Sequence, residues 1–286
     1  MTEPPPRERF LAAETSFEDS YIALFGCPYD ATATFRSGAR KGPEAIRRFS
    51  DALETYSPEL ENDLGKGPFS DMGDLELPDG RADEVLEVIS EHSRRVMSAG
   101  KIPFALGGEH LITLPLVIAA LEFHPDLVVF QWDAHADLRS DYEGNVLSHA
   151  TVMRRVAENI GDDRFLQFGV RSGTREEWKW MKKNRSVRPL ASDHVMAGLV
   201  EHQGRPIYLS VDLDVLDPSE CPGTGTPEPG GSTFLNLAEC IHTLRLSGVP
   251  VVALDVVELA PEIDPTGRSA VAAAKIVREL LLSLRV

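Results

Sequence analysis

The sequence predicts an α/β protein, a three-layer α/β/α sandwich whose mostly parallel sheet of about eight strands lies between helices. Short apolar runs rich in β-branched and aromatic residues, such as Leu127 to Trp132, alternate along the chain with longer amphipathic segments. That alternation is typical of a parallel sheet covered on both faces by helices. The chain has 286 residues, of which 42% are hydrophobic, enough to bury the core of one large domain.

The amino terminus is expected to be a proline-rich lead-in to a single domain that spans residues 1–286. This lead-in covers residues 1–19 and contains three large apolar side chains, Phe10, Leu11 and Phe17. We expect these side chains to pin the segment to the domain or to a neighbouring subunit.

The first half of the domain is predicted to alternate strands with helices. Pro43 suits the first turn of a helix, where its missing N–H would have no partner in any case. Apolar residues between Val85 and Met97 recur at helical spacing, and Gly100 follows as a C-terminal cap residue. Strands are expected at Tyr21 to Cys27, Phe69 to Gly73, Ile102 to Leu106 and Leu127 to Trp132, and helices from Gly42 to about Glu54, at Asp83 to Ala99 and at Thr113 to Glu122.

The second half continues this alternation to the end of the chain. Strands are expected at Arg164 to Val170, Val187 to Leu190, Ile207 to Val211 and Pro250 to Val257, and helices at Thr151 to Ile160, Thr174 to Lys183, Asp193 to Glu201, Phe234 to Leu246 and Ser269 to Leu284. A dinucleotide-binding fold has the same architecture, but no strand here is followed by the Gly-x-Gly-x-x-Gly turn that such folds use.

Carboxylate and imidazole side chains collect where three of the expected strands end. They are His110 after the first strand, Asp133, His135 and Asp137 after the second, and Asp212 and Asp214 after the third. A spacing of two puts such residues on one side of an extended backbone, and ligands bind beyond the carboxyl ends of parallel strands. Four carboxylates that converge without cations would repel each other and raise their pKa values. Two divalent cations would cancel that charge, and a ligand set without thiolate suits Mn²⁺ better than a structural Zn²⁺ site.

Two further strand ends and one loop carry other candidate site residues. Arg171 and Glu258 each follow a strand, and His149 lies in the loop beyond the strand that ends at Trp132. The plain interpretation of His149 is a neighbour of a helix cap supplied by Ser148, and that of Glu258 is a surface glutamate. A histidine that titrates near neutrality also suits proton transfer.

On its motifs the chain resembles the arginase/agmatinase family of ureohydrolases. The matching segments occur in the family's order and are Gly107 to His110, Trp132 to Asp137, Ser148 to Thr151, Ser210 to Pro218 and Gly223 to Gly231. Two positions depart from the pattern usual in agmatinases: Glu109 stands where Asp often precedes the ligand histidine, and Ala150 stands where Gly often follows the loop histidine. Neither position is a metal ligand, so the departures bear on subfamily and not on chemistry.

The resemblance implies a site for two Mn²⁺ ions per chain. Asp133 and Asp212 would bridge the ions, His110 and Asp137 would complete the shell of one, and His135 and Asp214 that of the other. In the same resemblance His149 moves a proton, and Glu258 holds the guanidinium by paired charge-assisted hydrogen bonds. The expected reaction is attack of a metal-bridging hydroxide on a guanidinium carbon, which releases an amine and urea.

The substrate is expected to be a small cationic guanidine, with agmatine, cleaved to putrescine and urea, favoured over arginine. Guanidinobutyrate and aminopropylagmatine are alternatives. The loop from Arg139 to Asn145 would face the far end of the substrate, where its acidic residues suit an amine tail and its arginine suits a carboxylate. The resemblance also implies a homo-oligomer, a trimer or a hexamer.

Composition narrows the classes of partner and the compartment. The net charge is −16, which argues against a nucleic-acid partner because such binding needs a basic face. No apolar run is long enough for a membrane span. The three cysteines are odd in number and widely spaced, which favours a reducing cytoplasm over a disulfide framework.

Two interpretations from other functional classes remain. A single-zinc deacetylase of related fold would use one Asp-His-Asp set and would not need His110 together with Asp212 and Asp214. A catalytically silent binding protein would have no reason to keep every ligand.

Overall fold

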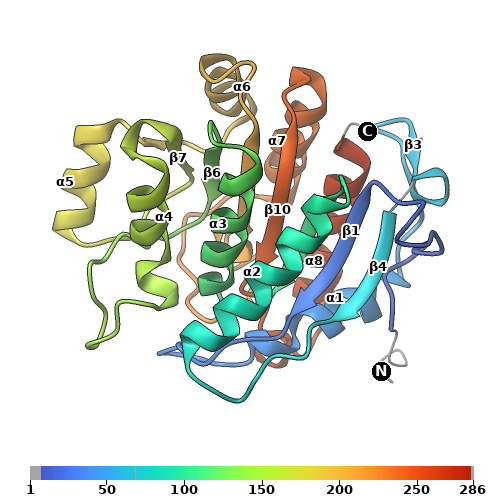
Figure 1. Ribbon diagram of the computed structural model, residues 1–286, viewed down its shortest axis with the longest axis horizontal. Helices are drawn as coiled ribbons and strands as arrows, with labels where there is room; N and C mark the ends of the chain where they lie inside the picture. Colours follow the sequence, from blue (N-terminus) through green and yellow to red (C-terminus); the bar gives the residue numbers. More distant parts are fainter. Residues whose placement is uncertain (1–7, 68, 285–286) are drawn as a thin grey trace.

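Eight parallel strands form one sheet with helices on both faces, so the predicted three-layer α/β class is confirmed (Figure 1). The computed structural model describes residues 8–67 and 69–284. The strand order is β4-β1-β5-β10-β9-β6-β7-β8. The strands are β1 (Ile22–Cys27), β4 (Phe69–Asp74), β5 (Ile102–Gly107), β6 (Val128–Trp132), β7 (Phe165–Phe168), β8 (Val187–Arg188), β9 (Ile207–Asp212) and β10 (Val251–Val257).

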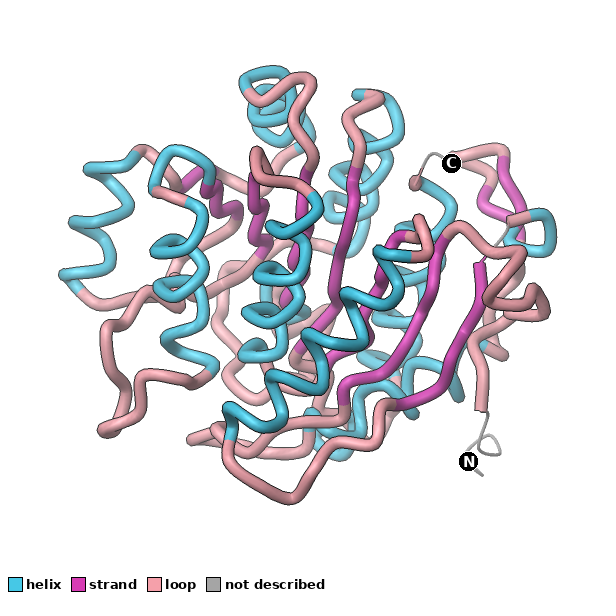
Figure 2. Tube along the Cα trace, viewed as in Figure 1, coloured by secondary structure: helices cyan, strands magenta, loops and turns pink. Residues whose placement is uncertain are grey.

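The helices form two layers, one on each face of the sheet (Figure 2). Residues of α1, α6, α7 and α8 share one buried apolar cluster with one face of the strands. Residues of α2, α3, α4 and α5 share a second cluster with the other face. The helices are α1 (Gly42–Ser50), α2 (Ala82–Ser98), α3 (Thr113–Phe123), α4 (Val152–Ile160), α5 (Arg175–Asn184), α6 (Ser192–Glu201), α7 (Phe234–Ser247) and α8 (Arg268–Ser283).

Side chains of the central strand β9 alternate between these two clusters. In β9, Leu209 and Val211 belong to the cluster of α1, α6, α7 and α8, whereas Tyr208 belongs to the other. Both faces of β9 are therefore buried, which explains why its sequence is a nearly continuous apolar run. Each fully buried side chain of this size contributes about 1.5–3 kcal/mol relative to an exposed one.

Several details of secondary structure differ from the prediction, and the strand expected at Val187 to Leu190, for example, ends at Arg188. The helix expected to reach Glu54 ends at Ser50. The Ser50 hydroxyl donates to the carbonyl of Arg47 at 2.6 Å, and this bond competes with the backbone hydrogen bonds that would continue the helix. The strand expected to reach Val170 stops at Phe168, because Gly169 adopts a φ of 91°. A short antiparallel pair, β2 (Tyr56–Ser57) and β3 (Asn62–Asp63), was not predicted.

The described part of the lead-in is fixed to the domain itself. Phe10 is 1% exposed, and its ring packs edge-on against Phe69 with 6.3 Å between the ring centroids. The backbone N–H of Phe10 donates to the Asp71 carboxylate at 2.7 Å, and that of Leu11 donates to Ser50 Oγ at 2.9 Å. The first seven residues of the predicted lead-in lie outside the described part of the chain.

The three cysteines, Cys27, Cys221 and Cys240, are free and buried. Within residues 8–67 and 69–284, no helix has the length and apolar character that a membrane crossing requires.

Candidate metal centre

The carboxyl ends of β5, β6 and β9 lie in the middle of the sheet and bring the six predicted ligands together. The turn after β5 depends on close backbone approach, because a Cβ on Gly108 would lie 1.8 Å from the carbonyl oxygen of Tyr29. Glycine at this position lets the chain pass Tyr29 and begin a short 3-10 helix, η3 (His110–Ile112), at the first candidate ligand.

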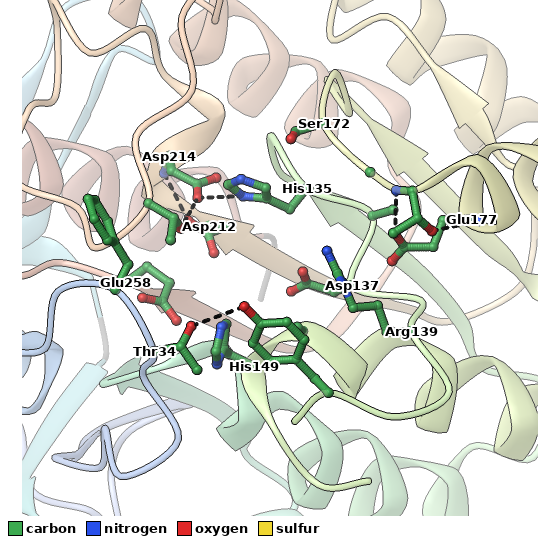
Figure 3. Close-up of a pocket in the computed structure, with 17 residues that line it drawn as sticks. Thr34, His135, Asp137, Arg139, His149, Ser172, Glu177, Asp212, Asp214 and Glu258 are labelled. Carbon is green, nitrogen blue, oxygen red and sulfur yellow. Dashed lines mark hydrogen bonds and ion pairs between the residues drawn. The ribbon is translucent and has the colours of Figure 1, made fainter. Parts of the chain in front are cut away.

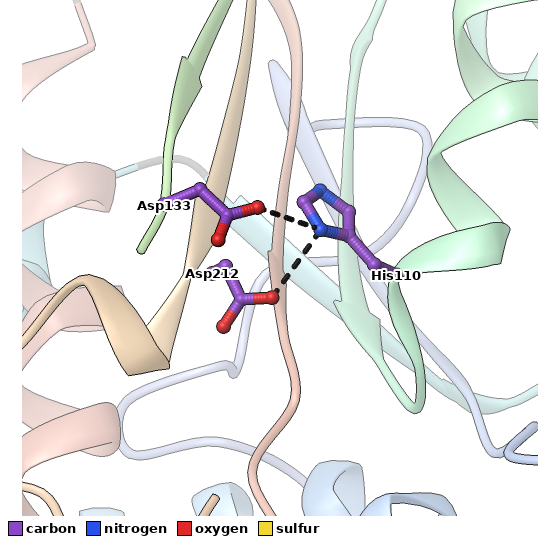
Figure 4. Close-up of side chains that lie close together, drawn as sticks. All are labelled: His110, Asp133 and Asp212. Carbon is purple, nitrogen blue, oxygen red and sulfur yellow. Dashed lines mark ion pairs between the residues drawn. The ribbon is translucent and has the colours of Figure 1, made fainter. Parts of the chain in front are cut away.

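The imidazole of His110 faces the carboxylates of Asp133 and Asp212 (Figure 4). Its Nδ1 atom is 3.1 Å from Asp133 Oδ2, 3.1 Å from Asp137 Oδ2 and 3.2 Å from Asp212 Oδ2. The imidazole is 1% exposed, and Nδ1 makes no directed hydrogen bond with any of these oxygens. A buried nitrogen that faces three carboxylates but has no hydrogen-bond partner fits a site where the nitrogen and the carboxylates would together bind a cation.

A second cluster forms around His135. Its Nδ1 atom is 2.9 Å from Asp214 Oδ2 and 3.8 Å from Asp133 Oδ1. The trio of His110, Asp133 and Asp212 and the trio of Asp133, His135 and Asp214 each offer ligand atoms within 4.8 Å of one another. Since Asp133 belongs to both trios, the donor set fits two adjacent divalent ions, and its oxygens and imidazoles suit Mn²⁺.

The backbone reaches this arrangement by a route that differs from the extended strand considered from the sequence. The chain bends at Ala134, whose N–H donates to Asp214 Oδ1 at 3.1 Å. Asp137 adopts a left-handed conformation with a φ of 52°, a region that Asp tolerates better than most residues. Asp214 lies in a 3-10 helix, η6 (Leu213–Val215), rather than on extended backbone.

The charges of the cluster perturb one another strongly. Burial lowers the pKa of His135, but Asp214 and Asp133 outweigh it and raise that pKa to about 11. Burial and the neighbouring Asp214 raise the pKa of Asp133 to about 7. Burial also acts to raise the pKa of Asp214, yet the charge of His135 lowers it to about 2. The carboxylates therefore need positive charge among them, and among the described residues of the two trios it comes from the imidazoles of His110 and His135.

A pocket of about 350 Å³ opens over these clusters (Figure 3). His110 and Asp133 are not among its lining residues and are at most 1% exposed, so they lie beneath the pocket. Its lining includes the candidate site residues His135, Asp137, His149, Asp212, Asp214 and Glu258, and the neighbouring Thr34, Phe35, Arg139, Tyr142, Ser172 and Glu177. Six of the predicted site residues thus line one cavity of the size that small ligands occupy.

His149 lines the pocket and is held by a network that the sequence did not reveal. Its backbone N–H donates to Thr32 Oγ1 at 3.1 Å, and its Nδ1 lies 3.4 Å from the same oxygen. The Thr32 hydroxyl donates in turn to Glu109 Oε1 at 2.6 Å. Glu109 is completely buried, which raises its pKa to about 7. The one sequence signal for this network was a glutamate beside a ligand histidine, and nothing marked Thr32.

Glu258 lies at the end of β10 with its carboxylate in the pocket. Its Oε1 atom accepts a hydrogen bond from the backbone N–H of His110 at 2.7 Å. Its backbone is left-handed, with a φ of 69°, which is unusual for glutamate and marks a position fixed by its surroundings. Burial and the nearby Glu109 raise its pKa to about 8. The interpretation of Glu258 as a surface glutamate is therefore wrong.

Arg171 does not reach the pocket, although it follows a strand as the other candidates do. Its guanidinium donates to backbone carbonyls, including those of Asp214 at 2.8 Å and Glu228 at 2.6 Å. Arg171 thus fastens two loops of the site to each other.

The loop expected to face the far end of a substrate is only partly in the pocket. Arg139 and Tyr142 line it, with the Arg139 guanidinium 4.8 Å from the centre of the Tyr142 ring. Asp141 and Glu143 are not among the lining residues, and Asp141 Oδ1 accepts from the N–H of Gly144 at 3.0 Å within the loop.

Comparison with known proteins matches residues 20–283 to the model of the arginase family. The agmatinase of Bacillus anthracis is 42% identical over 280 residues, which cover 96% of this chain and 95% of that protein. The N(1)-aminopropylagmatine ureohydrolase of Thermococcus kodakarensis is 38% identical over 262 residues, 88% of either protein. The crystal structure of the agmatine ureohydrolase of Thermoplasma volcanium superposes with a TM-score of 0.85 at 33% identity and covers 97% of this chain and 94% of that one.

Proposed function

The chain belongs to the arginase family, and we propose that it hydrolyses the guanidino group of agmatine to give putrescine and urea. The observation that carries the proposal is the pair of His and Asp trios that share Asp133 beneath a pocket. The choice of agmatine rests on the 42% identity with the agmatinase of Bacillus anthracis.

The proposed centre holds two Mn²⁺ ions per chain. Membership of Asp133 in both trios supports it as a ligand that both ions would share, and Asp212 would be the second shared ligand. His110 and Asp137 then complete one site, and His135 and Asp214 the other. Two bound divalent ions would bring the pKa of water close to neutrality and so supply the nucleophile for hydrolysis.

The remaining steps belong to side chains of the pocket. Glu258 Oε1 is occupied by the N–H of His110, which leaves Oε2 to accept from the substrate guanidinium. His149 has its Nδ1 toward Thr32, which leaves Nε2 to give a proton to the departing amine. Burial lowers the pKa of His149, so its neutral form prevails at pH 7 and the imidazole must first gain the proton that it passes on.

Replacing His149 by alanine is expected to lower turnover by roughly 10²–10⁴-fold, the usual contribution of a general acid or base. Metal content should stay at the wild-type value, because His149 belongs to neither trio. Steady-state urea release and elemental analysis of the same preparation measure both quantities. His194 is exposed on α6, so His194→Ala is the matched control and should keep full turnover. An unaltered rate in His149→Ala would return this residue to the role of a capping neighbour.

A urea-release screen over agmatine, arginine, guanidinobutyrate and aminopropylagmatine tests the substrate. Agmatine is expected to give the highest kcat/KM. A preference for arginine, or no urea from any of the four, would contradict the proposed activity. Aminopropylagmatine is the informative near neighbour, since the 38% identical Thermococcus kodakarensis protein bears its name.

Arg139 favours one second candidate, a guanidine with a carboxylate tail such as guanidinobutyrate. Its guanidinium lines the pocket, whereas the acidic residues of the same loop, Asp141 and Glu143, do not. Glu177 also lines the pocket and supplies a negative charge for an amine tail, although its oxygens already accept from the N–H groups of Leu138 and Thr174. A higher kcat/KM for guanidinobutyrate than for agmatine in the same screen would select the second candidate.

A further inference from the structure

Four buried polar side chains lie side by side across the middle of the sheet. They are register partners on neighbouring strands. Asp255 of β10 lies beside Ser210 of β9, Ser210 lies beside Gln131 of β6, and Gln131 lies beside Gln167 of β7. All four are 0% exposed. Buried polar groups are costly unless they are fully hydrogen-bonded, so a row of four in the core indicates a specific task. We call these residues the polar row.

The polar row lies directly below the metal centre. Ser210 is two residues before Asp212 and Gln131 is two before Asp133, so each shares a sheet face with the ligand that follows it. Tyr208, on that face of β9, packs in the cluster of α2, α3, α4 and α5. Two separate arms of hydrogen bonds connect the row to the centre.

The first arm fixes the proton on His110. Asp255 accepts hydrogen bonds from Ser210 Oγ at 2.7 Å, from Thr113 Oγ1 at 2.8 Å and from the hydroxyl of Tyr208. His110 Nε2 lies 2.9 Å from Ser210 Oγ. Because the only hydroxyl hydrogen of Ser210 goes to Asp255, its oxygen must accept from Nε2–H. The proton therefore stays on Nε2, and the Nδ1 lone pair is kept for the carboxylate cluster.

The second arm fixes the orientation of Asp133. The Gln131 amide nitrogen donates to Asp133 Oδ2 and to the carbonyl of His135 at 3.3 Å. Its oxygen accepts from Gln167 Nε2 at 2.6 Å, and Gln167 Nε2 also donates to the carbonyl of Ala136 at 2.9 Å. An amide flipped at Gln131 would set its oxygen against a carboxylate and its nitrogen against another donor. The pair of amides thus acts as a one-way chain of donors that ends on the shared ligand.

We propose that the polar row positions the metal ligands. Asp255 and Ser210 set the affinity for the ion that His110 binds, whereas Gln131 and Gln167 set the affinity for both ions through Asp133. This inference rests on the proposed metal-dependent function. It assigns the four residues a task apart from substrate binding, because all of them are buried beneath the pocket and none lines it.

The test is a calorimetric titration of the metal-free chain with Mn²⁺. Ser210→Ala is expected to lower the affinity for one of the two ions by about 10–100-fold and to leave the affinity for the other unchanged. Gln131→Met should lower the affinity for both ions by a similar factor. Ser210→Cys keeps the size of the side chain but accepts hydrogen bonds poorly, so the same selective loss is expected if the alanine variant does not fold. Ser93, on α2, is 0% exposed and its hydroxyl has no hydrogen-bond partner, so Ser93→Ala is the matched control.

The outcomes separate this inference from the proposed function. A wild-type chain that binds no Mn²⁺ would overturn the proposed function and the inference with it. Two ions bound with unaltered affinities in Ser210→Ala and Gln131→Met would overturn the inference alone. An equal loss in Ser93→Ala would also overturn it, since the effect would then belong to core packing and not to the two arms.

Discussion

An Asp133→Asn variant is expected to lose urea release and to retain fewer than two divalent ions per chain. Asparagine removes one negative charge and one of the two oxygens through which Asp133 takes part in both trios. Both ions should therefore bind more weakly, whereas loss of His110 or His135 would affect mainly one. Turnover should fall by at least the roughly 10²–10³-fold that the loss of one transition-state donor costs.

Elemental analysis and urea release, measured on one preparation after loading with Mn²⁺, check this expectation. Asp141→Asn is the matched control, because Asp141 lies outside the pocket lining and bonds within its own loop. Active wild-type protein with a single ion per chain, or full activity after exhaustive chelation, would refute the binuclear assignment.

Acid should also inactivate the enzyme, since imidazole and carboxylate bind metal only when they are deprotonated and the metal occupancy therefore falls as the pH falls.

A Glu258→Gln variant is expected to lose catalytic efficiency for every guanidine tested while it keeps both metal ions. The single amide oxygen of glutamine would stay with the N–H of His110, the present partner of Glu258 Oε1. Its amide nitrogen would then face the pocket and present hydrogens to a guanidinium that has only donors. An unpaired cation in a water-poor site costs on the order of 2–5 kcal/mol, so kcat/KM should fall by roughly 30-fold to several thousand-fold.

The comparison of several substrates separates an anchor from a ligand. An anchor for the guanidinium acts on every substrate equally, whatever its tail, and leaves the metal content unchanged. Loss of an ion in Glu258→Gln would instead make this residue a metal ligand, and unaltered activity would exclude it from the site. Glu262 is exposed and pairs with Lys41, so Glu262→Gln controls for removal of a nearby charge.

The architecture could be predicted from the sequence because a strand that is buried on both faces has a recognisable local pattern of apolar residues. Runs such as Ile207 to Val211 are apolar except for Ser210, and that nearly continuous pattern distinguishes a covered parallel strand from an amphipathic helix. It does not contain the order of the strands. The placement of β9 between β10 and β6 depends on pairings between distant segments, and the pair of β2 and β3 is too short to show any period.

The candidate site was predictable to the extent that its residues follow strands. The six proposed ligands do so, and the structure brings all of them together. Arg171 met the same criterion but bonds to loop carbonyls, because position after a strand does not determine where a long side chain turns. Thr32 and Glu109 interact across a separation of 77 residues, and the left-handed backbone of Asp137 is a property of the fold. Neither feature has a local pattern from which it could be inferred.

The polar row also favours one register of the sheet over the alternatives. Side chains alternate along a strand, so a slip of one residue in the register of β9 would bring Leu209 or Val211 to the place of Ser210. Asp255 and Gln131 would then lose their polar neighbour and remain buried beside a hydrocarbon side chain, a heavy penalty in the core. Parallel strands that are apolar on both faces otherwise carry little to tell one alignment from the next. The four polar residues supply that discrimination, and a chain that folds in the correct alignment has thereby already set its ligands in place.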